Sequence, residues 1–149
     1  MQRVRAASVE VDGARAAEIG HGMVVLLGVG AKDSAIDGER LAAKVASLRI
    51  FDDGSGKLQH TVADAHGGVL VIPQFTLYGD VRRGRRPDFM AAAPPELGQR
   101  LFDAFCGVLR ASGLTVSTGV FGATMRVQIE ADGPVTIVVS TDRWSEGEL

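Results

Sequence analysis

The sequence predicts an α+β fold in which a curled, β-rich, barrel-like sheet carries two main helices. Apolar strand-like runs open and close the chain, and two stretches with helical three-four spacing lie between them. The chain contains 19 glycines, against about ten expected from average usage, which favours tight turns and a strand-rich architecture. At 149 residues it is long enough to bury a core. We expect a single domain over residues 1–141, followed by a polar tail, 142–149.

The first half of the chain predicts three strands and one helix. Apolar residues alternate before the turn dipeptide Asp12-Gly13, and a short second strand and a nearly all-apolar third strand follow. Asp33 or Ser34 can cap the helix, whose apolar positions recur every three to four residues. The expected elements are strands over 4–11, 15–19 and 23–30 and a helix from 35 to about 51.

A continuously apolar run, predicted to be a strand buried on both faces, follows a loop with one helical turn over residues 57–67. The long connection 79–93 contains Arg and Pro and is of the kind that usually serves function. Pro94 and Pro95 then open a helix with clear three-four spacing. The expected elements are strands over 68–78, 114–117, 123–130 and 134–140 and a helix from 94–95 to about 112.

The composition excludes several classes of protein. Hydrophobic content of 46% and charged content of 23% fit a soluble globular chain, and no apolar run is long enough to span a bilayer. The first residues enter a strand without a signal-peptide pattern, so we expect a cytoplasmic protein with no membrane partner. The single cysteine, Cys106, lies on the apolar side of a predicted helix and is expected to pack as a small hydrophobe.

We expect neither a metal nor a cofactor. His21, His60 and His66 show no ligand spacing with Cys106 or with one another. His60 and His66 lie in a polar stretch, where exposure to solvent is expected.

The most informative local feature is the dipeptide formed by Gly133 and Pro134. It lies between two alternating apolar runs, where a proline marks a tight turn, and we expect the bond between the two residues to be cis. Gly133 allows the backbone to approach another group closely. The alternative is an ordinary hairpin turn at Asp132-Gly133. Three further segments favour the first interpretation: 71–78 (VIPQFTLY), 82–89 (RRGRRPDF) and 118–125 (TGVFGATM).

In order and spacing, these four segments resemble the D-aminoacyl-tRNA deacylase family, and the resemblance extends from the N-terminal strand to about residue 140. The resemblance implies a β-rich barrel with helices that works as a homodimer. It also implies an enzyme that acts on aminoacyl-tRNA. Such an enzyme hydrolyses the ester bond between a D-amino acid, or glycine, and the terminal ribose of tRNA, as chiral proofreading in translation.

The same resemblance assigns the catalytic segment to Gln74, Phe75, Thr76 and Leu77. In the account that it favours, main-chain N–H groups of this segment stabilise the oxyanion, and the ribose hydroxyl of the substrate carries the chemistry. No G-x-S-x-G elbow is present, and Thr76 is the best single nucleophile candidate. The alternative for Thr76 is a β-branched residue that packs within a strand.

For substrate selection, the resemblance points to Gly133 and Pro134, which would reach across the dimer into the pocket of the partner. Their carbonyl groups would hold the α-amino group of the substrate. An L-side chain would strike the corner, whereas a D-side chain or the hydrogen of glycine would not, so the selection works by steric exclusion.

A cluster of four arginines, among sixteen basic residues in total, consists of Arg82, Arg83, Arg85 and Arg86. On a chain of net charge −2, this cluster predicts a focused contact with tRNA phosphates. The alternative is a solvated loop without a partner.

Two positions depart from the family pattern. Pro73 stands where the family usually has Ser, and a proline in a strand suggests an edge, a bulge or an altered pocket rim. Ala131 stands where the family usually has Asn. A similar sister branch carries Pro-Gln at the first position and removes L-alanine from mischarged tRNA, so L-alanyl-tRNA is an alternative substrate. A further alternative is a catalytically silent protein that binds tRNA ends.

Overall fold

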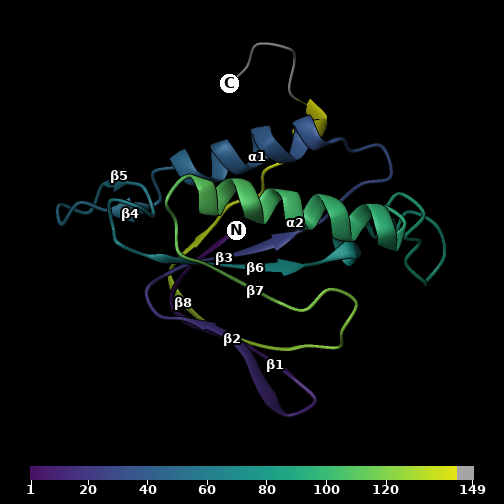
Figure 1. Cartoon of the computed structure of the whole chain (residues 1–149), viewed down its shortest axis with the longest axis horizontal. Helices are drawn as coiled ribbons and strands as arrows, with labels where there is room; N and C mark the ends of the chain where they lie inside the picture. The colour runs from purple at the N-terminus through teal and green to yellow at the C-terminus, as the bar shows by residue number, and fades with distance from the viewer. Residues whose placement is uncertain (144–149) are drawn as a thin grey trace.

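A computed structural model describes residues 1–143 as a main mixed sheet covered by two helices (Figure 1). The strands are β1 (Gln2–Val11), β2 (Ala14–Ile19), β3 (Gly22–Leu27), β4 (Phe51–Asp52), β5 (Leu58–His60), β6 (Gly68–Pro73), β7 (Val116–Thr118) and β8 (Arg126–Thr136). The helices are α1 (Ala35–Ser47) and α2 (Pro95–Ala111), with the short 3-10 helices η1 (Phe75–Tyr78) and η2 (Thr141–Arg143).

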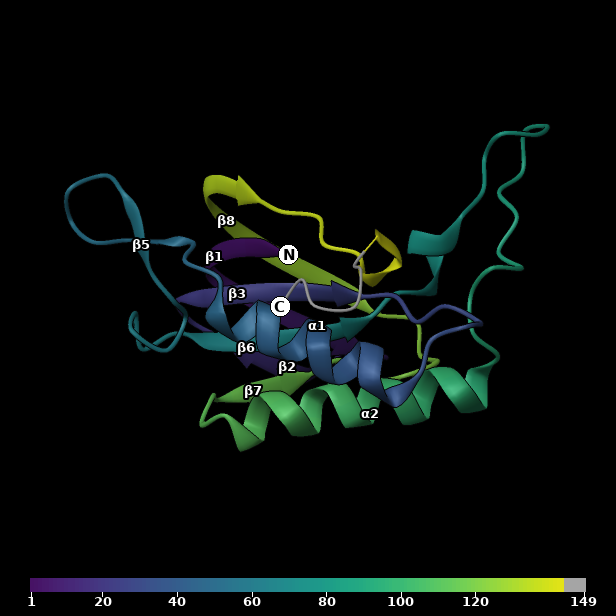
Figure 2. The same cartoon turned by 90° about the horizontal axis from the view of Figure 1, so that it is seen from above.

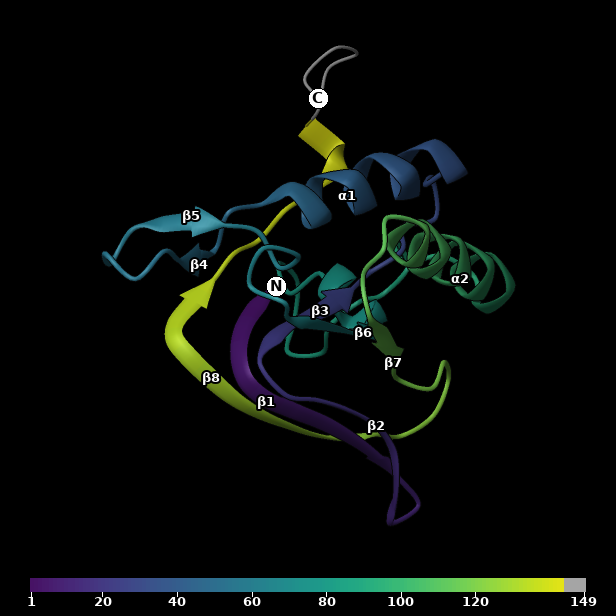
Figure 3. The same ribbon diagram turned by 60° about the vertical axis from the view of Figure 1, so that its left-hand side comes forward.

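Strand β1 organises the main sheet because it forms pairs along both of its edges. Gln2 and Val4 pair with β3 on one edge and with β8 on the other, and the second half of β1 pairs with β2. The remaining order is β3-β6-β7, and these three strands are parallel. Figure 3 shows β1 and β8 curving together beneath β3 and β6, so that the sheet curls on itself. The predicted α+β fold with a barrel-like sheet is confirmed.

Apolar clusters fill both faces of the sheet. Both helices lie on one face (Figure 2), where α2 contributes Phe105 and Leu109 to a cluster with the sheet. Along β6, Val69 and Val71 belong to this cluster, whereas Leu70 and Ile72 belong to a second cluster inside the curl. Successive side chains of a strand point to opposite faces, so β6 is buried on both, as predicted.

Helix α1 begins at the predicted residue but ends earlier than predicted. Ser34 is its N-cap, and Asp37 accepts hydrogen bonds from the Ser34 N–H (2.8 Å) and hydroxyl (2.7 Å). The helix stops at Ser47 because Leu48 is extended (φ −66°, ψ 129°), and Phe51 then enters the core as the first residue of β4. Helix α2 begins at Pro95 and ends at Ala111, close to its predicted bounds.

Three further predictions of local structure are wrong. Residues 58–60, predicted to lie in a loop, form β5, which pairs with β4. The strand predicted over 68–78 ends at Pro73, and the chain turns into η1. The two strands predicted over 123–130 and 134–140 are a single strand, β8, because β1 pairs with it on both sides of the Gly133-Pro134 bond.

Two long excursions leave the sheet at opposite ends of the molecule (Figure 2): the β4–β5 hairpin and the connection between η1 and α2. Of the predicted polar tail, residues 142–143 belong to η2, and 144–149 lie outside the described residues. Among residues 1–143, no helix is long and apolar enough to cross a membrane.

Candidate active site

A pocket of about 730 Å³ lies where β3 and β6 end. Leu27 and Ile72 come from the ends of these strands, and Gln74 and Phe75 from the turn that follows β6. Opposite walls come from the start of α2 and from residues 121–125, which precede β8. The pocket therefore brings together three of the segments that the sequence singles out, 71–78, 118–125 and, through Phe89, 82–89.

The turn after β6 presents main-chain donors beside this pocket. The Gln74 N–H donates to the Leu27 carbonyl (2.8 Å), and the Leu77 N–H makes a long contact with the Gln74 carbonyl (3.4 Å). Phe75 and Thr76 are the first two residues of η1, and within residues 1–143 their N–H groups have no hydrogen-bond acceptor. Unpaired N–H groups at the start of a helical turn are suited to an oxyanion.

Thr76 lies in η1 and is exposed, so the alternative that it packs within a strand is wrong. Its hydroxyl oxygen accepts a hydrogen bond from the Gln74 side-chain amide. Among the described residues, no histidine or carboxylate forms a hydrogen bond with this hydroxyl. A threonine nucleophile needs an adjacent base, so the surroundings of Thr76 do not activate it.

Pro73 lines the pocket where the ladder between β6 and β7 ends. The Gln74 N–H faces β3, so the backbone of residue 73 faces the β7 side. On that side the last ladder hydrogen bond runs from the Gly119 N–H to the Val71 carbonyl (2.8 Å), and proline has no N–H with which to donate the next one. The proline therefore occupies the last position of β6 and shapes the pocket rim.

The bond between Gly133 and Pro134 is cis, as predicted, but the corner that these residues form is a bulge within β8. From Ala131 to Thr136 the chain takes five steps, while β1 takes two, from Val4 to Gln2. Gly133 has φ +118°, a value that L-residues rarely adopt. The hairpin alternative is therefore wrong.

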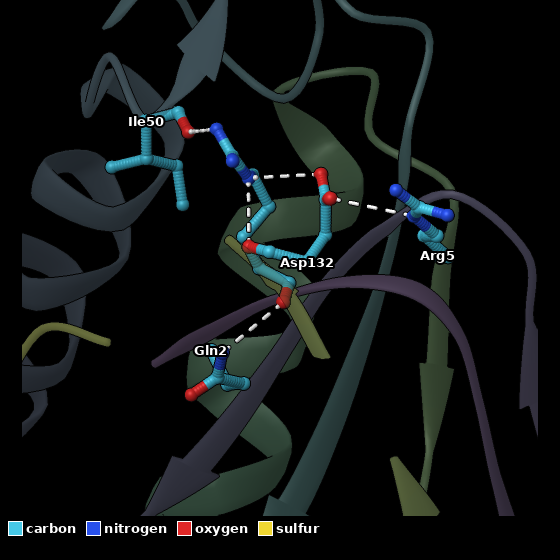
Figure 4. Close-up of polar contacts among 5 residues, drawn as sticks. Gln2, Arg5, Ile50 and Asp132 are labelled. Atoms are coloured by element: carbon cyan, nitrogen blue, oxygen red, sulfur yellow. Dashed lines mark hydrogen bonds and ion pairs between the residues drawn. The ribbon is translucent and has the colours of Figure 1, made fainter. Parts of the chain in front are cut away.

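The half-buried side chain of Arg3 holds the backbone just before the corner (Figure 4). Its Nε donates to the Asp132 carbonyl (3.2 Å) and pairs with the Asp132 carboxylate (3.2 Å), and its Nη1 donates to the Ile50 carbonyl (2.9 Å). Asp132 also faces Arg5 at 3.4 Å. Nothing in the local sequence pattern marks Arg3 for this contact, which joins residues 129 positions apart.

The corner and the pocket are far apart within one chain. Val127 lines the pocket and Pro134 lies seven residues further along β8, which at about 3.3 Å per residue is roughly 20 Å. The structure therefore places Gln74 and Phe75 at the pocket but does not bring Gly133 and Pro134 to it.

The arginine loop, residues 79–90, is a long hairpin-like excursion beyond η1. Asp80 and Asp88 close it through two backbone hydrogen bonds of 2.7 and 2.9 Å. All four arginines are exposed. Arg82 forms an ion pair with Asp80 (2.5 Å), and its hydrogen bonds lower the Asp80 pKa to about 2. Within the described residues, Arg83, Arg85 and Arg86 form no ion pair, so three cations face solvent.

Comparison with known proteins assigns the chain to a family. The family model described as D-Tyr-tRNA(Tyr) deacylase matches residues 1–140. The chain belongs to this deacylase family. It is 52% identical over 143 residues to the D-aminoacyl-tRNA deacylase of Anaeromyxobacter dehalogenans (strain 2CP-C), covering 96% of each chain. It is 50% identical over 141 residues to that of Bacillus cereus (strain B4264), covering 95% of this chain and 97% of the relative.

Two solved structures share the fold of the chain. The structure of the c-Myc DNA Unwinding Element Binding Protein has a TM-score of 0.86 at 40% identity, covering 93% of this chain and 95% of that one. A structure described as a probable eukaryotic D-amino acid tRNA deacylase has a TM-score of 0.76 at 20% identity, which shows a common fold, over 89% of this chain and 92% of that one.

Two phenylalanines of this deacylase-family pocket lie in segments that the sequence singles out but were not predicted as site residues. Phe121 lines the pocket and packs against Gly98 of α2, where an added Cβ would lie 3.1 Å from the Phe121 ring. Phe89 of the arginine loop contacts Phe75 edge to face, with ring centroids 5.2 Å apart. The local signal for the Phe121 contact is Gly98 itself, because a glycine inside a helix leaves room for a side chain from another segment.

The remaining titratable candidates lie outside the pocket. Cys106 is buried in α2, as predicted, and burial raises the pKa of its thiol to about 11. His60 and His66 are exposed, as predicted, although His60 belongs to β5, and His21 lies edge to face with Phe51. Among the described residues, no three His, Cys, Asp or Glu side chains cluster as metal ligands.

Proposed function

We propose that this chain hydrolyses the ester bond of D-aminoacyl-tRNA, and of glycyl-tRNA, and releases the free amino acid and the tRNA. One observation carries the proposal: Gln74 and Phe75 line the pocket, and within residues 1–143 the N–H groups of Phe75 and Thr76 have no acceptor. The relatives that share about half of the sequence bear the name of this activity.

In the proposed reaction, the ester carbonyl lies beside η1, where the Phe75 and Thr76 N–H groups face its oxygen. Water attacks the carbonyl carbon with help from the neighbouring ribose hydroxyl, and negative charge collects on the carbonyl oxygen. The two N–H groups stabilise that charge more than they stabilise the neutral ester, which lowers the barrier. Collapse of the intermediate breaks the bond to the ribose oxygen, which leaves with a proton. Thr76 forms no covalent bond in this scheme.

Selection between D- and L-substrates is proposed to need a second copy of the chain. Gly133 and Pro134 lie away from the pocket of their own chain, so a homodimer in which each corner enters the partner's pocket would supply the selector. The corner carbonyls would hold the α-amino group, and an L-side chain would collide with the backbone.

The tRNA itself is proposed to contact the arginine loop. Phe89 of this loop lines the pocket, so a substrate whose ester lies in the pocket carries its phosphates past the loop. Arg83, Arg85 and Arg86 are exposed cations suited to phosphate oxygens, and Arg82 is held by Asp80. Because aminoacyl-tRNA is the substrate, we place the activity in the cytoplasm.

Pro73 favours one second candidate, hydrolysis of L-alanyl-tRNA, because the proline lies in the pocket lining at the position that marks the sister branch. A deacylation assay with D-tyrosyl-, glycyl- and L-alanyl-tRNA separates the candidates. We expect D-tyrosyl- and glycyl-tRNA to be hydrolysed and L-alanyl-tRNA to be spared. Hydrolysis of L-alanyl-tRNA alone would favour the sister-branch activity, and tRNA binding without any hydrolysis would indicate a silent binder.

A further inference from the structure

The turn that carries the proposed oxyanion donors is weakly held by its own packing. None of the four residues of η1 is buried, and Phe75 and Leu77 are both 58% exposed. A 3-10 turn of this length has few internal hydrogen bonds to fix it. Phe75 contacts Phe89 from the exposed side, and Tyr78 is the one residue of η1 that is partly buried, so its side chain can anchor the turn on the protein.

Tyr78 lies against the loop that follows β3. A Cβ added at Gly28 would lie 3.1 Å from the Tyr78 ring and 3.3 Å from the Gln74 carbonyl oxygen. A Cβ added at Gly30 would lie 2.7 Å from the Tyr78 hydroxyl and 3.2 Å from an Asp33 carboxylate oxygen. A side chain at either position would crowd Tyr78, and the Tyr78 hydroxyl and the Asp33 carboxylate converge at Gly30.

The backbone of Gly30 also holds Asp33 in place. Its carboxylate accepts the Gly30 N–H (2.8 Å), and its own N–H donates to the Gly30 carbonyl (3.1 Å). Burial raises the Asp33 pKa, and the hydrogen bond from the Gly30 N–H, with a smaller contribution from Tyr78, acts against that rise. Burial, followed by the charges of Asp33 and Asp142, raises the Tyr78 pKa to about 12. Asp37 adds to the negative charge around both groups.

The same loop is tied to the opposite wall of the pocket. The Ala31 N–H donates to the Ala91 carbonyl and the Ala93 N–H to the Val29 carbonyl, both at 2.9 Å. Ala93 and Val29 line the pocket. The loop after β3 is thus the common support of η1 and of the wall that faces it.

We propose that Tyr78 and Asp33, whose hydroxyl and carboxylate meet at Gly30, form a positioning pair in which the hydroxyl donates to the carboxylate, fixes η1 on the loop after β3 and so aims the Phe75 and Thr76 N–H groups at the reacting ester. The inference rests on the proposed function, since it assigns that orientation a role in hydrolysis. Neither residue lines the pocket, so we expect the pair to affect the rate of the chemical step rather than binding.

The activity test is Tyr78→Phe, which removes the hydroxyl and keeps the ring against Gly28. We expect kcat for D-tyrosyl-tRNA to fall on the order of tenfold, equivalent to about 1.4 kcal/mol, with KM and the melting temperature nearly unchanged. Asp33→Asn should lower kcat in the same way. Adding Asp33→Asn to Tyr78→Phe should cost little more, because the two changes break one contact. Asp37→Asn, which removes a nearby charge without touching the hydroxyl, is the control and should keep kcat.

A second measurement detects the Tyr78–Asp33 pair and does not depend on an activity assay. Tyr78 is the only tyrosine of the chain, so the absorbance of tyrosinate follows this one group. In Asp33→Asn the hydroxyl should titrate at lower pH than in the parent, while burial keeps its pKa above the ordinary value. Near neutral pH, the amide resonance of Gly30 should shift in Tyr78→Phe, which gives the same answer without exposure to alkali.

The outcomes separate the inference from the proposed function. If the titration and the Gly30 resonance are the same in variant and parent, the pair does not exist, whatever the activity. If the pair exists but Tyr78→Phe keeps full kcat, the positioning role is refuted and the hydrolysis stands. If the parent hydrolyses none of the aminoacyl-tRNAs, the proposed function fails, and the positioning role that rests on it fails with it even though the spectra still show the pair.

Discussion

The pocket and the Gly133-Pro134 corner are built in different ways. The pocket is lined by residues from β3, β6, α2 and the segment before β8, all of which pack on the core of one chain. The corner is a bulge in an exposed strand, held by one arginine and by its pairing with β1. A cavity needs many segments of one chain, whereas a backbone selector needs only to be rigid and to protrude. If the corner is the selector of the proposed site, one chain carries both halves of that site without joining them.

The largest effect is expected when a dimer that joins the corner of one chain to the pocket of the other is separated into monomers. If the corner acts in a partner's pocket, the active species is a dimer, and dilution to monomer should remove both the discrimination between D- and L-substrates and most of the activity. Light scattering at several concentrations, with deacylation measured on the same samples, tests this. A monomer with intact activity and selectivity would show that the pocket works alone.

Next, Gly133→Ala should blur the D/L distinction. The new Cβ would lie 3.0 Å from the Val135 nitrogen and 3.1 Å from an Arg3 Nη atom, at a φ of +118° that alanine rarely adopts. We expect the ratio of D- to L-tyrosyl-tRNA hydrolysis to fall at least about tenfold, or roughly 1.4 kcal/mol, with a smaller change in D-tyrosyl-tRNA turnover.

Gly13→Ala is the matched control, because Gly13 also has a positive φ (+78°) but nothing lies within 4 Å of its added Cβ. Any general effect of backbone strain should appear in both variants. Equal loss of selectivity in the two, or full selectivity in Gly133→Ala, would remove the corner from the selection mechanism.

A moderate effect is expected from changes in the arginine loop, which lies next to the pocket because its Phe89 lines it. Replacing Arg82, Arg83, Arg85 and Arg86 with Ala should weaken tRNA binding and flatten its salt dependence. Each lost phosphate contact lowers the slope of log K against log salt by about 0.7 to 0.9. Since Arg82 already pairs with Asp80, Arg82→Ala alone should change the slope less than Arg85→Ala. An unchanged slope in the fourfold variant would show that the arginine loop is a solvated loop without a contact to tRNA phosphates.

The smallest effect is expected from Thr76→Ala. The Thr76 hydroxyl accepts a hydrogen bond from Gln74, and no histidine or carboxylate among residues 1–143 bonds to it, so its loss should keep at least about a tenth of kcat. Removal of a true nucleophile costs on the order of a million-fold in a serine hydrolase. A loss of kcat of that size, in a variant with an unchanged melting temperature, would indicate a covalent mechanism in which the Thr76 side chain is the nucleophile.

Local pattern was enough for most of the elements and for part of the site. The helix over Pro95–Ala111 is predicted because proline starts a helix and three-four spacing buries one face. The end of α1 and the length of β6 were missed, because apolar residues such as Phe51 and Leu77 continue the pattern after the backbone has turned away. Apolar spacing records which residues can be buried, and it does not record where the backbone changes direction.

By itself, the sequence determined the α+β class, the strand buried on both faces, the position of the rigid Gly133-Pro134 dipeptide and the arginine cluster. Each of these depends on the chemistry of neighbouring residues, such as alternation, ring closure in proline or the missing Cβ of glycine. Only the tertiary structure decided that β8 runs through the corner, that Phe121 and Gly98 meet at the pocket, and that Arg3 and Tyr78 anchor distant segments. Those contacts join residues tens of positions apart or more, and they form because the curl of the sheet brings the segments together, which no local periodicity encodes.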